Sequence, residues 1–274
     1  MDQVQLTTFQ TVVEHGSFEA AARALHVTPS AVSQRIKALE KSVGQVLVRR
    51  AKPCTATEAG EALVRFAGQV ALLEREALGQ ARAGTRLSIV VNADSMNSWF
   101  LPVLTRVPGV TFEVHTDDQD HTAELLRAGI AMAAVTAERI AVQGCRVERL
   151  GAMRYLPVAA PGFDATDLSR APMLLYNRKD RLQHRFLGDR PEPPIHYVPG
   201  AAAFNEAIRL GLGWGLVPEQ NARPDLEAGR YVDIAPGRYL DVPLYWQCWR
   251  IESDTLNTLT AAVRTAAVEA LRRD

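Results

Sequence analysis

The stretch SFEAAARALHVTPSAVSQRIKALEKSVGQVLVRR, residues 17–50, decides the fold of the N-terminal part of this 274-residue chain. Ser17 is a good helix N-cap and begins a short alanine-rich helix predicted over residues 18–25. Thr28 then caps a longer helix, with Pro29 at the first helical position, where its missing N–H is not needed. Upstream, apolar residues at helical spacing predict another helix that ends at Gly16. Together these elements predict a helix-turn-helix.

The helix that begins after Thr28 has two faces of different chemistry. An apolar stripe is expected to pack on the domain core and consists of Val32, Ile36, Leu39 and Val43. Another face combines hydroxyls, an amide and cations, namely Ser30, Ser33, Gln34 and Lys37, with Arg35 beside them. Amide and guanidinium groups read base edges in the major groove, and hydroxyls reach phosphates. This face therefore suits a DNA groove; an ordinary solvated surface is the alternative interpretation.

A β-hairpin is predicted directly after this helix. Residues 46–50 read as a short strand, Lys52 and Pro53 as a turn, and residues 54–56 as the returning strand. Such a hairpin beside a helix-turn-helix is a wing. It places Arg49, Arg50 and Lys52 near the phosphate backbone, where cations supply affinity without sequence information.

The run at 17–50, followed by TATEAG at 55–60, resembles the DNA-binding domain of the LysR-type transcriptional regulators. The resemblance implies that PSAVSQRIKALE, residues 29–40, is the recognition helix. We expect residues 1–57 to form a winged helix-turn-helix domain. Its expected DNA contacts are Ser17, Thr28, Pro29, Ser30, Ser33, Gln34, Arg35, Lys37, Arg49, Arg50 and Lys52.

Residues 58–84 are predicted to be a linker helix that dimerises. Thr57 can cap a helix from Glu58 to about Ala83. An apolar seam with alternating spacings of three and four, as in a coiled coil, consists of Leu63, Phe66, Val70, Leu73 and Ala77. A dimer is favoured because two-fold pairs of helix-turn-helix domains read palindromic half-sites. The resemblance also implies this dimer, and often a dimer of dimers. The alternative is a helix packed on its own domain.

The remainder, residues 85–274, alternates between strands and helices. Strands are predicted at 87–91, 111–115 and 132–136, with helices at about 96–106 and 120–128 between them. Similar α/β units follow at 155–159, 173–176, 196–198, 202–210 and 214–217, and the chain closes with a strand at 242–250 and a helix at about 253–272. This alternation predicts a parallel sheet covered on both faces.

A strand and helix after the second α/β block suggest that the chain leaves one lobe and returns to it. This arrangement resembles the two-lobed periplasmic-binding-protein fold, which is the effector domain of the LysR family. We expect lobe one at about 87–158 plus 243–274 and lobe two at about 159–242. A ligand is then expected between the lobes, at the carboxyl ends of strands.

Within the family, several segments resemble the lysine- and arginine-responsive branch, the LysG and ArgP regulators. They are VNADSMNSWFLPVL at 91–104, LLRAGIAMAAVT at 125–136, GCRVERLGAMRYLPVA at 144–159, AFNEAIRLGLGWGLVPE at 203–219 and DVPLYWQCWR at 241–250. The resemblance implies L-lysine or L-arginine as the effector, and activation of an amino-acid exporter gene.

The strand ends offer groups that suit a basic amino acid. Ser95 and Asn97 begin a helix, where free N–H groups favour a carboxylate, and Thr136 adds a hydroxyl. Asp94, and one member of an acidic run that includes Asp118, are expected to pair with cations. Further expected effector contacts are Trp99, Phe204 and Glu206. The alternatives are plain helix capping for Asp94 and Ser95, a solvated loop for the acidic run, and the core for both aromatic residues.

Composition limits the other possibilities. Net charge is zero, so DNA binding depends on local clusters of cations. The three cysteines are scattered, which argues against a disulfide framework and a local zinc motif. No secretory signal or membrane span is apparent, so a cytoplasmic location is expected. We found no nucleophile elbow, phosphate loop or metal-ligand cluster, so catalysis, a cofactor and a metal are not expected.

The expected partners are double-stranded DNA with a palindromic operator, RNA polymerase, a small-molecule effector and further copies of the chain in a homodimer or homotetramer. The main alternative function is a low-specificity architectural DNA binder with a merely structural α/β domain. Binding of that kind uses contacts with the DNA backbone alone. It depends steeply on salt concentration and shows no preference for one DNA sequence over another.

Overall fold

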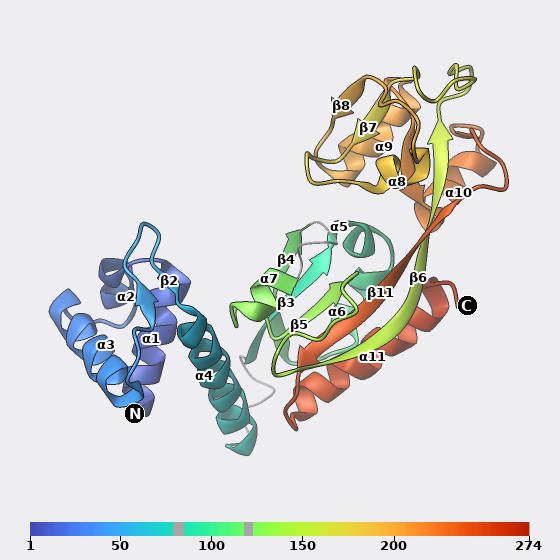
Figure 1. Cartoon of the computed structure of the whole chain (residues 1–274). Helices are drawn as coiled ribbons and strands as arrows, with labels where there is room; N and C mark the ends of the chain where they lie inside the picture. Colours follow the sequence, from blue (N-terminus) through green and yellow to red (C-terminus); the bar gives the residue numbers. More distant parts are fainter. Residues whose placement is uncertain (79–84, 118–122, 274) are drawn as a thin grey trace.

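A computed structural model of the chain describes residues 1–78, 85–117 and 123–273 (Figure 1). Its N-terminal domain contains the predicted helices and hairpin. The elements are α1 (Gln3–His15), α2 (Phe18–Ala24), α3 (Pro29–Val43), β1 (Val48–Arg49) and β2 (Thr55–Ala56). The predicted caps are confirmed: Ala20 N donates to Ser17 Oγ at 3.0 Å, and Ala31 N donates to Thr28 Oγ1 at 3.2 Å.

The core of this domain holds α3 in a fixed orientation. Val32, Ile36 and Leu39 are completely buried, as the stripe predicts, whereas Val43 at the helix end is 39% exposed. The hairpin is tied to the helices by backbone groups. Cys54 N donates to Gly16 O at 2.7 Å, and Leu47 N donates to the Glu40 carboxylate at 3.0 Å.

Helix α4 (Glu58–Ala77) connects the N-terminal domain to the rest of the chain (Figure 1). Thr57 caps it, as predicted, by accepting from Gly60 N at 3.1 Å. The expected continuation to Ala83 lies outside the described residues. One side of α4 is buried within the chain at Gly60, Val64, Ala67, Gly68 and Leu72.

A seven-stranded sheet has the order β10-β6-β11-β5-β3-β4, and β9 also pairs with β6. The strands are β3 (Thr85–Asn92), β4 (Val110–Asp117), β5 (Ala133–Thr136), β6 (Cys145–Ala159), β9 (Gly215–Pro218), β10 (Val232–Asp233) and β11 (Leu240–Trp249). Among the described strands of this sheet, the parallel pairs are β3 with β4 and β3 with β5. The expectation of a parallel sheet was therefore wrong for the whole, because β6 and β11 form a long antiparallel pair.

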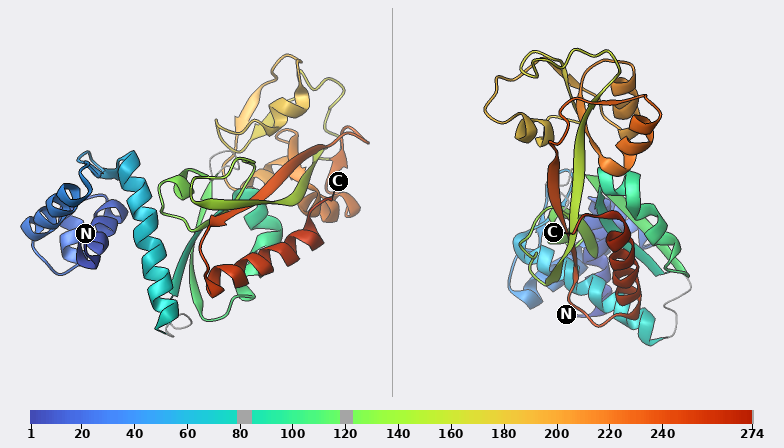
Figure 2. Two further views of the ribbon diagram at one scale, coloured as in Figure 1. Left: turned by 60° about the horizontal axis from the view of Figure 1, so that its bottom comes forward. Right: turned by 90° about the vertical axis from the view of Figure 1, so that its right-hand side faces the viewer.

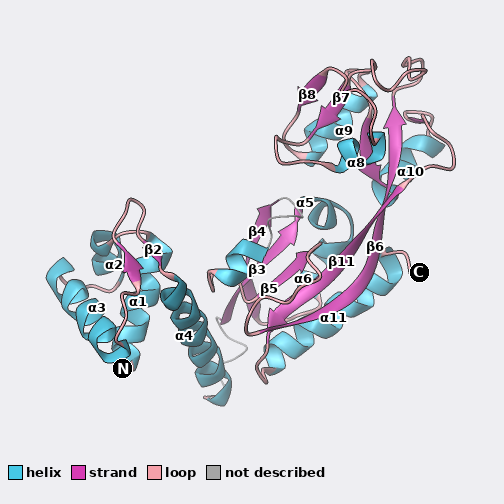
Figure 3. Ribbon diagram, in the orientation of Figure 1, coloured by secondary structure: helices cyan, strands magenta, loops and turns pink. Residues whose placement is uncertain are grey.

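The helices of this domain are α5 (Ala93–Ser95), α6 (Leu101–Thr105), α7 (Ala123–Arg127), α8 (Leu182–Leu187), α9 (Ala201–Arg209), α10 (Glu219–Glu227) and α11 (Asp254–Ala270). Figure 3 shows them around the strands. The single helix expected at 96–106 is a composite, since a π-helix, η1 (Met96–Phe100), lies between α5 and α6. Helices α8 and α10 were not predicted. Within the described ranges, no helix is both long and apolar enough to cross a membrane.

The domain has two lobes, and β6 and β11 run between them (Figures 1 and 2). Lobe one contains β3, β4, β5 and the long α11. Lobe two contains α8, α9, α10 and a small parallel sheet of β7 (Met173–Leu175) and β8 (Ile195–Tyr197). Residues 155–159 of β6 pair with β9 and β10, so β6 already belongs to lobe two before residue 159. This geometry places the strand ends of lobe one opposite α8, α9 and α10.

Candidate functional sites

The outer face of α3 presents the predicted polar side chains. Ser30, Gln34 and Lys37 are exposed, and Ser33 is half-buried. Arg35 is also half-buried, because its guanidinium group leans towards α1 and donates to Thr8 Oγ1 at 3.4 Å. The face thus carries an amide, hydroxyls and a free ammonium group, which are the groups that contact base edges and phosphates.

The predicted residues at the helix starts have mainly a positioning role. Ser17 and Thr28 use their hydroxyl groups to cap α2 and α3. Pro29 is exposed at the first position of α3. Thr28 Oγ1 also lies 3.0 Å from Ser30 Oγ. These contacts fix the first turn of α3, the end from which a recognition helix reaches into a groove.

The hairpin presents an exposed group of cations. Arg49, Arg50 and Lys52 are all exposed, and the Arg50 guanidinium carbon lies 5.1 Å from the centre of the Phe18 ring. Within the part of the chain that the structure describes, neither Lys37 nor any of these three cations forms a salt bridge. Cations without acidic partners are available to neutralise phosphates.

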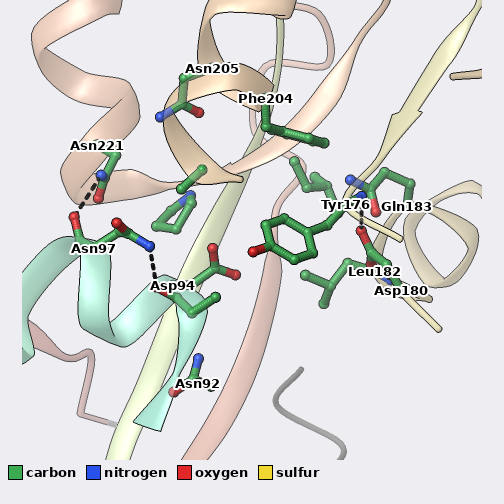
Figure 4. Close-up of a pocket in the computed structure, with 14 residues that line it drawn as sticks. Asn92, Asp94, Asn97, Tyr176, Asp180, Leu182, Gln183, Phe204, Asn205 and Asn221 are labelled. Carbon is green, nitrogen blue, oxygen red and sulfur yellow. Dashed lines mark hydrogen bonds between the residues drawn. The ribbon is translucent and has the colours of Figure 1, made fainter. Parts of the chain in front are cut away.

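A pocket lies between the two lobes (Figure 4). Lobe one contributes Asn92, Ala93, Asp94 and Asn97 from the end of β3 and the helix that follows it. The other lining residues are Tyr176, Asp180, Leu182, Gln183, Ala201, Phe204, Asn205, Leu216, Pro218 and Asn221. The pocket therefore has the expected position, at the carboxyl end of a parallel strand.

Each lobe contributes a carboxylate to the lining of the pocket. Asp94 Oδ2 accepts from the hydroxyl group of the completely buried Tyr155 at 2.7 Å. Asp180, which is 7% exposed, accepts from Tyr176 N and Leu182 N, each at 3.0 Å. In Figure 4 the Tyr176 side chain points from lobe two towards Asp94. Acids on both walls favour a ligand with more than one cationic group.

Several amide groups of the pocket lack partners. Both side-chain polar atoms of Asn92, Gln183 Oε1 and Asn221 Oδ1 are buried and have no hydrogen-bond partner among the described residues. Asn92 and Gln183 are each only 1% exposed. Leaving a buried polar group unpaired costs about 1–3 kcal/mol. These groups therefore fit a polar ligand that supplies both donors and acceptors.

Of the predicted effector residues that the structure describes, Asp94, Asn97 and Phe204 line this pocket, and four do not. Ser95, Trp99 and Thr136 are buried but do not line the pocket, and the Thr136 hydroxyl accepts from Glu138 N at 3.0 Å. Glu206 points away on α9 and pairs with Arg209 at 2.9 Å. Asp118 lies outside the described residues.

The pocket also has polar lining residues that were not predicted from the sequence, namely Asn92, Tyr176, Asp180, Gln183, Asn205 and Asn221. Asn92 is the last residue of β3, and Tyr176 directly follows β7. The rule that selected Asp94, which favours residues at strand ends, therefore applies to both. Asp180, Gln183 and Asn221 depend on α8, which has only 6 residues, and on α10, which is mostly polar. Among the described residues, no group of His, Cys, Asp and Glu is arranged to hold a metal ion.

The winged domain and the two-lobed domain each match a known family. Residues 4–61 match the bacterial regulatory helix-turn-helix proteins of the lysR family, and residues 80–271 match the LysR substrate binding domain. The lysine export transcriptional regulatory protein LysG of Corynebacterium glutamicum is 46% identical over 292 residues, covering 99% of this chain and 100% of that protein.

Solved structures agree over the full length. ArgP from Mycobacterium tuberculosis is 49% identical, with a TM-score of 0.90 and coverage of 100% of both chains. Full-length LysG from C. glutamicum with bound effector Arg is 44% identical, with a TM-score of 0.83, covering 99% of this chain and 100% of that one. These relatives are named as transcriptional regulators and not as enzymes. The chain belongs to the LysR family of bacterial helix-turn-helix transcriptional regulators.

Proposed function

We propose that this regulator responds to a basic amino acid, L-lysine or L-arginine, bound in the interlobe pocket. The observation that carries the proposal is the pair of carboxylates, Asp94 and Asp180, which face the pocket from opposite lobes. A basic amino acid has two cationic groups and one carboxylate. Its cations suit Asp94 and Asp180. Among the described residues Asn92 Nδ2 is a buried donor without a partner, which suits the carboxylate, and Gln183 Oε1 is a buried acceptor without a partner, which suits a further N–H of the ligand.

The shape of the pocket supports the same ligand. The ring of Phe204 and the side chain of Leu182 line it beside the polar groups, which suits the methylene chain of such an amino acid. The relative from C. glutamicum was solved with bound effector Arg. Asn97 is proposed as a further contact, because its side chain lines the pocket next to Asp94.

We propose that the effector acts by population shift. A ligand that contacts both lobes binds the closed arrangement better than the open one, and so changes the balance between them. Residues 1–57 are proposed as the DNA-binding unit, residues 58–84 as the linker and residues 85–274 as the two-lobed sensor, with closure like that of periplasmic binding proteins. The change in the sensor then alters how paired DNA-binding units meet a palindromic operator.

The proposed partners are RNA polymerase at the promoter and further copies of the chain, in a cytoplasmic location. The proposed target is an amino-acid exporter gene, since the C. glutamicum relative is named for lysine export.

Isothermal titration with the common amino acids tests the effector. We expect binding of L-lysine or L-arginine and no binding of L-leucine or L-glutamate, because the pocket presents acids to its ligand. Tighter binding of an acidic or apolar amino acid would contradict the proposal.

Gln34→Ala tests the separation of DNA binding from sensing. The variant loses an amide on the recognition face, so operator affinity is expected to fall about 5- to 150-fold, the equivalent of one good base contact. Effector affinity is expected to stay unchanged. Gln143→Ala removes an exposed amide from the sensor and is the matched control. Equal loss of both activities in Gln34→Ala would count against two separable units.

A further inference from the structure

The first turn of α10 joins the two lobes beside the pocket. Glu219 Oε2 accepts from Arg272 Nε at 3.0 Å and from Arg272 Nη2 at 2.6 Å. The neighbouring Gln220 side chain donates to Ala270 O. Asn221 Nδ2 then donates to Asn97 O at 3.1 Å (Figure 4). Three consecutive residues of lobe two therefore bind groups that belong to lobe one.

Arg272 is fixed to lobe one by its backbone. Its N–H donates to Ala152 O, and its carbonyl group accepts from Ala152 N, both at 2.9 Å. The approach requires glycine at position 151. A Cβ there would lie 2.8 Å from Arg272 O and 2.8 Å from Leu271 Cβ, and the φ angle is +146°. The Arg272 side chain is thus presented to α10 from a defined place.

The contact is partly shielded from water. The side chain of Glu219 is 13% exposed and that of Arg272 is 46% exposed. Burial raises the pKa of Glu219, but hydrogen bonds from Arg272 and Arg223 outweigh this effect and hold the pKa below its usual range. Glu219 is therefore charged near neutral pH. Arg223 also pairs with Glu219, but it lies on α10 itself and so does not connect the lobes.

The same turn forms a wall of the pocket. Asn221 and Asn97 both line it, and the buried Oδ1 atom of Asn221 has no partner among the described residues. The position of the first turn of α10 therefore sets how far apart the two walls stand. A contact that holds this turn against lobe one favours the closed pocket.

We propose that Glu219 and Arg272 form an interlobe latch that positions Asn221 and favours the closed state of the sensor, and so sets effector affinity. The link to affinity rests on the proposed function, but the latch itself is a property of the two lobes. When the binding-competent state is only fractionally populated, the apparent affinity is the intrinsic affinity multiplied by that fraction. Loss of the latch consequently weakens effector binding without removing any residue that contacts the ligand.

The first arm of the test measures the distance between the lobes in the absence of ligand. Spin labels on Ile140→Cys in lobe one and Leu210→Cys in lobe two report the interlobe distance, because these side chains are 83% and 78% exposed. Labelled chains are diluted in unlabelled ones so that only pairs within one chain contribute. Arg272→Gln and Glu219→Gln are expected to shift the distribution to longer distances, and Arg223→Gln is expected to leave it unchanged. An unchanged distribution in Arg272→Gln would overturn the latch.

The second arm measures L-arginine binding by titration calorimetry. The apparent Kd is expected to rise about two- to fivefold in Arg272→Gln, a size typical of a partly exposed ion pair. The charge-swapped double variant, Glu219→Arg with Arg272→Glu, is expected to recover part of the loss, which a general folding defect does not allow. Recovery supports the latch, and its absence counts against it. Failure of the unmodified protein to bind any basic amino acid contradicts the effector proposal alone, since the distance measurement still decides the latch.

Discussion

At the scale of single residues, Asp94 offers the cleanest test of charge recognition. Asp94→Asn keeps an acceptor for the Tyr155 hydroxyl group but removes the negative charge. Hydrogen bonds to charged groups are worth about 1.5–3 kcal/mol, so the affinity for L-lysine is expected to fall roughly 10- to 150-fold. Titration calorimetry measures the change.

The matched control for this substitution is Asp164→Asn. Asp164 is an acid outside the pocket lining, where hydrogen bonds from Thr166 lower its pKa. The control is expected to bind L-lysine like the unmodified protein. An unchanged Kd in Asp94→Asn would mean that another group pairs with the ligand's cation.

Predicted residues line the pocket where one local rule decided their position. Asp94 was selected because it follows a buried strand, and Asn97 because it lies at the beginning of the helix after that strand, where free N–H groups favour a carboxylate. Glu206 was expected to contact the effector, but it does not line the pocket. Phe204 and Glu206 are two positions apart, so they point roughly 200° apart around α9, and one helix cannot present both to the pocket.

At the scale of elements, α4 is docked on lobe one by complementary shapes and charges. Gly68 lies against the indole of Trp249, and a Cβ at Gly68 would lie 2.6 Å from Trp249 Cη2. The Glu76 carboxylate accepts from Ser253 Oγ at 2.6 Å and from Thr255 N at 3.1 Å. A negative charge at the N-terminus of α11 is favourable. These contacts make α4 a continuation of the sensor.

Gly68→Val tests this docking. The added methyl groups collide with the buried Trp249, so the free energy of unfolding is expected to fall by about 1–3 kcal/mol, typical of overpacking. The effect of ligand on operator binding is expected to weaken as well, because α4 no longer follows lobe one. Thermal melting and a gel-shift assay with and without L-arginine measure the two quantities.

Ala62→Val, on the exposed side of the same helix, is the control for this test. Both variants place the same β-branched side chain on α4. Helix propensity alone favours Gly68→Val over Ala62→Val, so a larger loss of stability in Gly68→Val is due to the collision with Trp249. Identical melting curves for the two variants would show that the contact with Trp249 is not tight in solution.

The elements that escaped prediction share one property, which is that the local sequence does not signal them. Helix α10 is mostly polar and contains Pro224, and Ala222 and Leu226 alone are too few to mark a helix in the sequence. Helix α8 is only Leu182–Leu187. The antiparallel pairing of β6 with β11 joins segments about a hundred residues apart, and period-2 or apolar patterns do not report strand direction. Capped helices such as α1 and α3 were predictable, because their signals are local.

At the scale of the whole molecule, the pocket and the DNA-binding face are joined by packed elements. Asp94 lies at the end of β3 in lobe one, α4 packs on lobe one through Leu72, and α4 continues into the winged domain (Figure 1). Gly60 of α4 lies against Leu47 of the hairpin, where a Cβ would lie 2.3 Å from Leu47 O. These contacts form a continuous packed path, along which we propose that a change in lobe one moves the helix and the winged domain.

The side of α4 that faces away from its own chain is the proposed place of that pairing. Phe66 is 42% exposed and Leu73 is 39% exposed, although both are large and apolar, and both belong to the predicted seam. A coiled coil buries such positions against a second helix.

Leu73→Glu is expected to convert a dimer to monomers, since it places a charge in the seam. It is also expected to reduce operator affinity by more than tenfold, because one winged domain makes only half of the DNA contacts. Arg75→Glu introduces the same side chain on an exposed position outside the seam and is expected to stay dimeric. Light scattering at several protein concentrations gives the mass, and equal masses for Leu73→Glu and the unmodified protein would place the pairing surface elsewhere on the molecule.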